Sequence, residues 1–398
     1  MRRVAGSALS VAAAFLSLMA ILIDAPALFY MSFALIATLI AANVQSTLAI
    51  RSLRIERIVP ESVTVGESAT VELVLWSERR IRRPLVTVTD ELPARMHARD
   101  LGPSLPVAPS FDQPIRTQYR FRPLKRGRFR LSRVAVTGTD ALGLVLKTTT
   151  YETAPAEIIV VPRPIPVEME LPSGSGWGAS EAQSGSIRGA GIEVRGLREY
   201  TTGDSLRYVD WRSSARSGRL QVKEFEAGTH GRIAIVLQQN PALDPPGVAI
   251  SAYDAMCGHA LGLATRLMRQ GVAVSFPDFE NADQVVRAES EREDELALML
   301  GAASPQPERT LAQSAALAAA NAAPGAGIVL LVGVDDGTAE EAVRAIGDRG
   351  APTFLLYDPR DYDGTFRGIA MANSAGLETL RRAGAMLVTM PRIGEEGV

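Results

Sequence analysis

Two long apolar runs open the chain. No residue from Ser7 to Ile23 is charged, an Asp-Ala-Pro triplet at 24–26 interrupts the run, and a second uncharged run extends from Ala27 to Ile50. A helix that spans a bilayer needs about 20 apolar residues, so the first run is slightly short and the second is long enough. Residues 1–50 therefore predict a hairpin of two transmembrane helices, whose backbone hydrogen bonds are satisfied within lipid.

Positively charged residues flank this predicted hairpin. Arg2 and Arg3 precede it, and Arg51, Arg54 and Arg57 follow it. Positive charge at both outer ends predicts cytoplasmic termini, as in a two-helix protein of the cell inner membrane with the bulk of its chain in the cytoplasm. The rival interpretation is a cleaved signal peptide, but no convincing small-residue cleavage site precedes the second apolar run.

Apolar and polar residues alternate in residues 51–161, as they do in half-buried strands. Val71, Leu73 and Leu75 show a period of two, Val86 and Val88 repeat it, and turns rich in Gly and Pro separate the runs. Short strands at this spacing predict an immunoglobulin-like β-sandwich, although a barrel would give the same pattern.

The remainder of the chain begins with a connector and ends with a different period. Residues 162–190 are rich first in Pro and then in Gly and Ser, which is typical of an exposed, mobile connector. In residues 231–398 we expect strands at Ile233–Leu237, Val272–Phe276, Ile328–Val332, Thr353–Tyr357 and Met386–Thr389, and helices at Val248–Arg269, Glu291–Leu300, Leu311–Ala323 and Ala339–Asp348. This alternation predicts a parallel sheet with helices on both faces, so the chain is multi-domain with α and β parts.

The segment between these parts, residues 191–230, carries the densest mixture of charges and rings. Residues 195–226 hold seven basic residues, five acidic residues, two Tyr and Trp211. We expect a strand, a turn, a short helix from Ser205 to Trp211 capped by Asp204, a second turn and a returning strand. Guanidinium groups pair with carboxylates in a two-pronged geometry and stack on rings, so this mixture favours a locked local structure.

The same segment closely resembles the signature of the bacterial domain-of-unknown-function 58 family. The matching residues are Arg198, Tyr200, Gly203, Asp204, Arg207, Asp210, Trp211, Ser214, Ala215, Arg216, Leu220, Val222 and Lys223. The segments Pro123–Leu131 and Gly138–Leu144 also resemble the region that precedes this signature. The resemblance implies a membrane hairpin, a β-sandwich and a von Willebrand factor type A-like, Rossmann-like domain, with a MoxR-type AAA+ ATPase as partner.

The resemblance to a type A domain also implies a metal site, built from Asp-x-Ser-x-Ser after the first strand. Here Gln238, Asn240 and Ala242 replace the carboxylate and both hydroxyls. Because Mg²⁺ prefers hard anionic oxygens, we expect a degenerate loop with neither metal nor cofactor. Asp335 and Asp336 follow a later strand, where the family pattern often has a further acidic loop.

Charge is distributed unevenly. The formal net charge of −2 hides 18 basic against 10 acidic residues in 51–150, and 13 against 22 in 231–398. The basic part includes Arg116, Arg120, Arg122, Lys125, Arg126, Arg128, Arg130 and Arg133. Such a cluster suits lipid headgroups, an acidic partner or a solvated face; no nucleic-acid fold signature accompanies it, so nucleic acid is not an expected partner. The single cysteine, Cys257, excludes an intrachain disulfide and is expected to be buried.

The sequence patterns of common enzymes are missing. No Gly-x4-Gly-Lys-Ser/Thr phosphate loop or Gly-x-Ser-x-Gly elbow occurs, and the three histidines are widely spaced. We therefore assign no catalytic residue, and the leading hypothesis is a non-enzymatic adaptor whose signature residues lock the fold or bind a MoxR-type AAA+ ATPase or an envelope protein. The alternatives are an uncharacterised enzyme centred on the Arg/Asp signature and a metal-dependent adhesion module.

Overall fold

The computed structural model describes most of the chain and divides it into two compact units, Met1–Val160 and Val161–Val398. The described residues are 2–80, 85–99, 104–111, 113–168, 194–199, 209–225, 232–279, 285–288, 293–322, 326–347 and 352–394. The first unit holds two apolar helices and two sheets, and the second holds a larger sheet with helices and a small two-stranded sheet.

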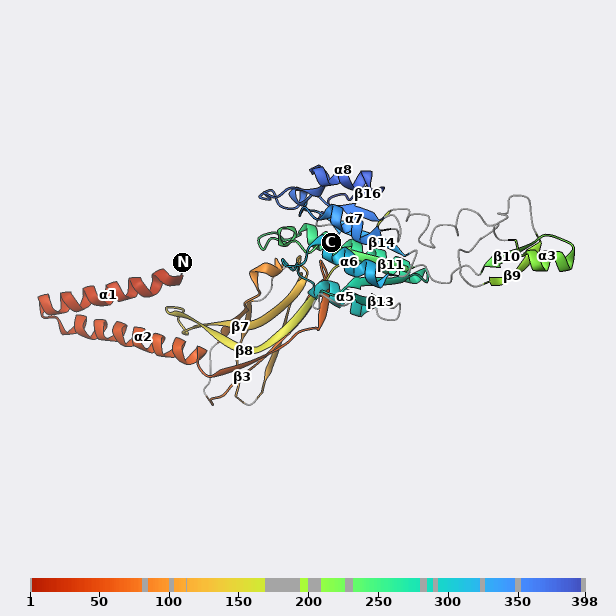
Figure 1. The fold of residues 1–398 in the computed structure, drawn as a ribbon. Coiled ribbons are helices and arrows are strands. Elements are labelled where there is room, and N and C mark those ends of the chain that lie inside the picture. Colours follow the sequence, from red (N-terminus) through yellow and green to blue (C-terminus); the bar gives the residue numbers. More distant parts are fainter. Residues whose placement is uncertain are drawn as a thin grey trace. The chain divides into compact units, whose positions relative to one another are not determined.

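The two predicted N-terminal helices are present. Helices α1 (Arg2–Ile23) and α2 (Pro26–Ile50) run antiparallel to each other (Figure 1). The chain reverses at Asp24, which has a left-handed φ of 48°, and the fixed φ of Pro suits the first turn of α2. Mean hydropathies of 2.2 over Gly6–Ile23 and 1.9 over Pro26–Ile50 make both helices long and apolar enough to cross a membrane.

Most of the buried residues of this helix pair are small, and many of its large apolar residues are exposed. Ala13, Ala20, Ser32 and Ala42 are buried, and the Ser32 hydroxyl donates a 3.1 Å hydrogen bond to the Ala13 carbonyl across the pair. The exposed large apolar residues include Val11, Phe15, Leu18, Ile21, Leu22, Phe29, Met31, Phe33, Ile40 and Val44. This distribution is the reverse of that in a helix pair of a soluble protein.

Two mainly antiparallel sheets follow in the first unit. The smaller sheet has the order β1 (Leu53–Ile58), β3 (Ala69–Ser77) and β6 (Ile115–Phe121). The larger sheet has the order β2 (Ser62–Thr64), β8 (Leu146–Val161), β7 (Gly127–Thr139), β4 (Val86–Asp90) and β5 (Ser104–Val107), and a 3₁₀ turn, η1 (Ala94–Met96), follows β4. Val71, Leu73 and Leu75 are fully buried, so the alternation predicted for this strand is confirmed.

A buried ion pair connects the two sheets. Arg57 of β1 donates through Nε to Asp90 Oδ2 at 2.9 Å and through Nη2 to Asp90 Oδ1 at 2.5 Å, and both side chains are 0% exposed. The Tyr119 hydroxyl of β6 donates to Asp90 Oδ2 at 2.6 Å. A buried charge is costly unless it is paired, so this two-pronged geometry favours one position of β1 and β6 relative to β4.

The second unit contains a six-stranded sheet in the order β13-β12-β11-β14-β15-β16. Its strands are β11 (Arg232–Leu237), β12 (Ala273–Pro277), β13 (Val285–Ala288), β14 (Gly327–Val332), β15 (Thr353–Leu356) and β16 (Met386–Thr389). Five strands are parallel, but β13 pairs antiparallel with β12. The prediction of a parallel sheet is therefore wrong at this edge, because the connection from Pro277 to Val285 is too short for a crossover of about a dozen residues.

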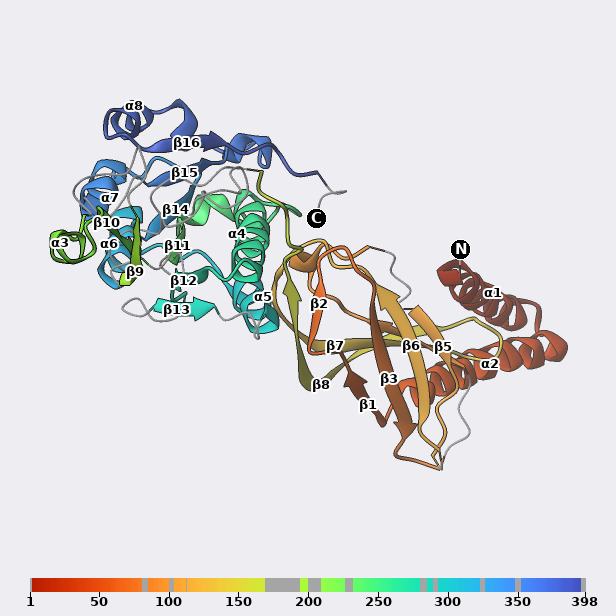
Figure 2. The same ribbon diagram turned by 90° about the vertical axis from the view of Figure 1, so that its right-hand side faces the viewer.

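Helices cover both faces of this sheet, as predicted (Figure 2). Helices α4 (Ala252–Arg269) and α5 (Glu293–Ala302) pack in the core that contains Ile233, Ile235 and Leu237. Helices α6 (Leu311–Asn321), α7 (Ala339–Ile346) and α8 (Ala375–Arg382) pack in the core that contains Ala234 and Val236. Short 3₁₀ turns lie at η3 (Pro241–Leu243), η6 (Pro359–Asp361) and η7 (Met371–Asn373).

Two helix assignments differ from the sequence expectation. Helix α4 begins at Ala252 rather than Val248, because Ser251 and Asp254 form a reciprocal capping box at its start. Helix α8 was not predicted from the sequence. Cys257 on α4 is fully buried, as predicted.

The first residues of the predicted connector pack on α4. The Ile165 N–H donates to the Gly258 carbonyl at 3.0 Å, and Arg266 Nη1 donates to the Val167 carbonyl at 2.8 Å. A Cβ at Gly262 would lie 2.0 Å from the Ile165 carbonyl oxygen, so glycine is what allows this approach. Residues 162–168 are therefore part of the second unit rather than an exposed, mobile linker, and the rest of the predicted connector lies outside the described residues.

Candidate functional site

The signature segment folds into a small strand–helix–strand element. Strand β9 (Val194–Glu199) pairs antiparallel with β10 (Gln221–Phe225), and helix α3 (Trp211–Ser217) lies against β10 (Figure 1). The predicted end of a helix near Trp211 is wrong, because Val209 and Asp210 are not helical and α3 begins at Trp211; residues 205–208 of that prediction lie outside the described residues. The chain has its cap at Asp210 and its left-handed C-terminal glycine at Gly218, which bound a helix between them.

Asp210 and Ser214 hold this element together. The Asp210 carboxylate accepts a hydrogen bond from the Ser213 N–H at 2.9 Å and so caps α3. The Ser214 hydroxyl donates to the Asp210 carbonyl at 2.8 Å and accepts from the Gln221 N–H at 2.8 Å. The Asp210 N–H in turn donates to the Gln221 carbonyl at 2.8 Å. These bonds tie the start of α3 to the start of β10.

Trp211 and Arg216 of this element are exposed. Trp211 is 65% exposed although it is the first residue of the helix. Arg216 is exposed in the last turn, where a positive charge interacts favourably with the carboxyl end of the helix. The element therefore presents an aromatic ring and a guanidinium group on a backbone that other residues hold in place.

The other signature residues are described in part or not at all. Arg198 and Lys223 are described by their backbone alone, in β9 and β10, opposite Val222 and Leu197 respectively. Tyr200, Gly203, Asp204 and Arg207 lie outside the described residues.

Gln238 closes the loop after β11, where the sequence led us to expect a degenerate metal loop. Its side chain is buried, its Oε1 accepts from the N–H groups of Gly333 and Val334, both at 3.0 Å, and its Nε2 donates to the Val334 carbonyl at 2.6 Å. Asn240 Oδ1 accepts from the Ala242 N–H at 3.0 Å. The Gln238 amide thus joins the loop after β11 to the loop after β14, and both lone pairs of its oxygen are used.

The two carboxylates after β14 have local structural roles. Asp335 Oδ1 accepts from the Gly337 N–H at 2.9 Å. Asp336 accepts from the Thr338 N–H and hydroxyl, and its Oδ2 accepts from the Leu311 N–H at the start of α6 at 3.2 Å. Within the described part of the chain, no three His, Cys, Asp or Glu side chains gather in a way that could hold a metal ion.

A buried His–Tyr pair lies in the core between α4 and the sheet. The Tyr357 hydroxyl, just after β15, forms a 3.0 Å hydrogen bond with His259 Nδ1 on α4. Burial lowers the pKa of His259 to about 4, although a hydrogen bond with the Ala255 backbone opposes this shift. Burial also raises the pKa of Tyr357 well above its usual value. Both rings are therefore neutral near pH 7.

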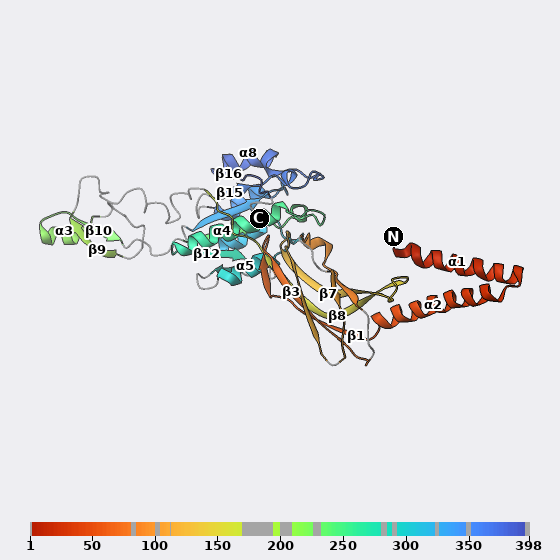
Figure 3. The same ribbon diagram turned by 180° about the vertical axis from the view of Figure 1, so that it is seen from behind.

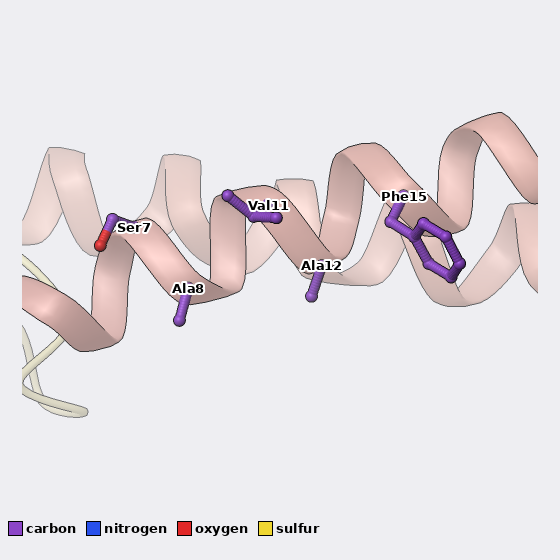
Figure 4. Close-up of a pocket in the computed structure, with 5 residues that line it drawn as sticks. All are labelled: Ser7, Ala8, Val11, Ala12 and Phe15. Atoms are coloured by element: carbon purple, nitrogen blue, oxygen red, sulfur yellow. The ribbon is translucent and has the colours of Figure 1, made fainter.

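A hollow on the surface of α1 has an apolar lining. It is lined by Ser7, Ala8, Val11, Ala12 and Phe15, which repeat at one-turn spacing along the helix (Figure 4). The lining offers one hydroxyl and no ionisable group, so it suits an acyl chain better than a reacting substrate.

Part of the second half of the chain matches a known protein family. The family described as protein of unknown function DUF58 matches residues 196–363, from β9 through η6. This match supports a DUF58 family protein. This DUF58 match includes the α3 element and five of the six strands of the larger sheet, so the family signature and the loop closed by Gln238 lie in one matched region.

Solved structures similar to this chain share low identity with it. A CARDB domain from Pyrococcus furiosus, solved in complex with di-metal ions, is 17% identical over 27% of this chain and 93% of that chain, with a TM-score of 0.19. A β-glucosidase from Listeria innocua is 12% identical over 25% of this chain and 16% of that chain, with a TM-score of 0.15. No curated protein matches the chain.

Sequence reasoning missed two features of the protein, the helix cap at Asp210 and the contact of His259 with Tyr357. The helix cap at Asp210 could have been predicted, since a capping residue at 210 and a glycine eight positions later, at 218, together mark the two ends of a short helix. No sequence pattern indicates the contact of His259 with Tyr357, because 98 positions separate the two residues and only the packing of α4 against the sheet brings them together.

Proposed function

We propose that this DUF58 protein is a membrane-anchored, non-enzymatic adaptor that binds another protein through the exposed face of α3. The observation that carries the proposal is Trp211, a large ring that is 65% exposed on a short helix. Trp and Arg are enriched among the few residues that dominate binding energy at interfaces. Since Asp210 and Ser214 already fix the helix, binding would require little further ordering of the backbone.

The family resemblance suggests the class of partner. A MoxR-type AAA+ ATPase would supply the ATP hydrolysis for which this chain has no phosphate-binding loop. An envelope protein is the other partner class that we consider. Either would be brought to the membrane by binding to α3.

The surface of the N-terminal helix pair supports membrane anchoring. Only 11% of each candidate span is buried within the protein, and the exposed residues are large and apolar. Small buried residues and hydroxyl hydrogen bonds between helices are typical of helices that pack within lipid. We propose that the pair spans the inner membrane with both ends cytoplasmic, because Arg2, Arg3 and Arg51 lie at those ends.

We further propose that the first-unit sheets form an immunoglobulin-like sandwich and that the larger sheet is a degenerate von Willebrand factor type A-like domain. The buried Arg57–Asp90–Tyr119 group between the two sheets supports the sandwich. Gln238 supports the degenerate assignment, because its amide bonds the backbone at the position of a metal-binding carboxylate. A metal-dependent adhesion module would need this loop rebuilt. An enzyme centred on the signature would need a carboxylate available for proton transfer, whereas the Asp210 carboxylate caps α3.

Affinity purification of the full-length protein from detergent-solubilised membranes tests the adaptor role. We expect an AAA+ ATPase or an envelope protein to be enriched with the wild type and lost with Trp211→Ala. Ile369→Ala is the matched control, because it removes another large apolar side chain, 63% exposed, from the same unit. If Trp211→Ala retains every partner that Ile369→Ala retains, α3 is not the docking surface.

A further inference from the structure

The hairpin between β7 and β8 reaches the helix pair within the first unit (Figure 3). The Ala141 N–H at its tip donates to Gln45 Oε1 of α2 at 3.1 Å. A Cβ at Gly6 of α1 would lie 2.6 Å from the Leu144 carbonyl oxygen, so the backbone of the tip also passes close to α1. Residues 140–146 are therefore held beside the first turns of α1 and the last turns of α2.

Three contacts behind the tip fix the hairpin to the end of α2. Lys147 Nζ donates to Thr47 Oγ1 at 2.6 Å, and the Tyr151 hydroxyl donates to the carbonyl of Ile50. At Gly138 an added Cβ would lie 2.6 Å from Ile50 Cγ2, so only glycine allows the strand to approach the helix this closely. The hairpin is thus attached to α2 on both of its strands, at residues 138, 147 and 151.

The tip has a built structure rather than an extended loop. The buried Asp140 carboxylate accepts from the Leu142 N–H at 2.9 Å through Oδ2 and from the Val145 N–H at 2.7 Å through Oδ1. Gly143 has a left-handed φ of 69°, and its N–H donates to the Asp140 carbonyl at 3.1 Å. These bonds fix the backbone on both sides of Leu142.

This fixed tip displays large apolar side chains. Leu142 is 68% exposed and Leu146 is 42% exposed. Hairpin tips in water are usually rich in Gly, Asn, Asp and Ser, whereas this tip has the sequence Asp-Ala-Leu-Gly-Leu-Val-Leu. An ordered loop that keeps leucine outward is suited to an apolar surrounding.

The length of α2 indicates how deep the tip of the hairpin would lie in a bilayer that the helix spans. Its 25 residues extend about 37 Å at 1.5 Å per residue, whereas the hydrocarbon core of a bilayer is about 30 Å thick. If the core begins at Pro26, roughly 20 residues cross it and the helix leaves it near Gln45. Gln45 is the residue that Ala141 contacts. The tip therefore lies at the level where acyl chains meet headgroups.

We propose that residues 141–146 form a third membrane contact, in which Leu142 inserts into the boundary between headgroups and acyl chains of the leaflet nearest the sheets. This inference rests on the membrane anchoring of α1 and α2 proposed above. The occupant is lipid rather than a protein, because the tip is continuous with the helix pair and lies at its lipid boundary. Lys147 is the first charged residue after the tip, as expected for a residue at the headgroup level. The contact would hold the first-unit sheets in one orientation on the bilayer.

Lipid-quenching fluorescence on the purified full-length protein tests this contact. The single cysteine is removed as Cys257→Ala, and an environment-sensitive fluorophore is attached in turn at Leu142→Cys, at Thr150→Cys on exposed β8, and at Phe33→Cys on α2. The protein is reconstituted into phosphatidylcholine–phosphatidylglycerol vesicles that carry bromine at shallow or deep acyl positions. No other protein is present, so quenching reports lipid alone.

We expect shallow bromine to quench the label at 142, deep bromine to quench the label at 33, and neither to quench the label at 150. A label at 142 that behaves like the label at 150, with 33 still quenched, would overturn the third contact and leave the anchoring intact. A label at 33 that is not quenched would overturn the anchoring and the third contact together. Quenching at 150 equal to that at 142 would show that the fluorophore itself seeks lipid, and would also contradict a contact specific to the tip.

Discussion

Asp90→Ala should strongly destabilise the first unit. The substitution leaves the Arg57 guanidinium buried between the sheets with only Thr153 Oγ1 at 3.0 Å and the Arg133 carbonyl at 3.1 Å as acceptors. Removing one partner of a buried ion pair costs about 3–5 kcal/mol, because the remaining charge is uncompensated. Tyr119 also loses the acceptor of its hydroxyl. Since about 1.4 kcal/mol corresponds to a tenfold change in an equilibrium constant, this cost should lower the ratio of folded to unfolded protein by roughly two to three and a half powers of ten.

Hydrogen exchange of the amides of β3 and β4, measured by mass spectrometry in detergent, reports this equilibrium. Glu78→Ala is the matched control, since it breaks the Arg54–Glu78 pair of the same sheet, in which the side chains are 67% and 45% exposed. Exposed pairs contribute about 0–1 kcal/mol, so the control should change exchange by less than about tenfold. The double variant Arg57→Ala with Asp90→Ala should be less destabilised than the sum of the single variants. Exchange in Asp90→Ala no faster than in Glu78→Ala would refute the claim that this pair holds the sheets together.

Three further predictions concern the second unit. His259 has a folded pKa of about 4, below its unfolded value of about 6.5, so its contribution to stability is complete above pH 6.5 and is lost as the pH falls toward 4. The unfolding temperature should therefore fall over this pH range, and His259→Gln should make that fall smaller. Gln238→Glu removes the amide donor and buries a charge, so it should cost about 1–3 kcal/mol or more in chemical denaturation, and Mg²⁺ should not restore the loss. Gly262→Ala should lower the unfolding temperature, because its Cβ would lie 2.0 Å from the backbone of residue 165. Gly247→Ala is the control, because a Cβ there meets open space and should not lower the unfolding temperature. Equal effects of the two substitutions would contradict the close packing at Gly262.

Elements with a strong local pattern could be predicted from the sequence. The uncharged runs gave both N-terminal helices, with the break at Asp24, and strands such as β14 and β16 were placed to within a residue. These predictions succeed because apolar periodicity and charge-free length are local properties of the chain. The antiparallel β13 was missed because its four residues have no pattern long enough to separate a strand from a loop.

The details of the sites depended on contacts between distant residues. Arg57 and Asp90 are 33 positions apart, and nothing local shows that their charges are paired in the interior. Gln238 could be singled out from the sequence, but its bonds to the backbone of the loop after β14 depend on how β11 and β14 pair. In the signature, the sequence offered Asp204 as a helix cap; Asp204 lies outside the described residues, and the described helix α3 is capped by Asp210 and ends at Gly218.

The measurement that tests the adaptor role most directly is photocrosslinking in intact cells from a photoreactive amino acid placed at Trp211. The same probe at Arg344, an exposed position on α7 in the same unit, serves as the control. We predict a discrete crosslinked product from position 211, containing an AAA+ ATPase or an envelope protein, that position 344 does not give. Identical crosslinking patterns from the two positions would contradict it.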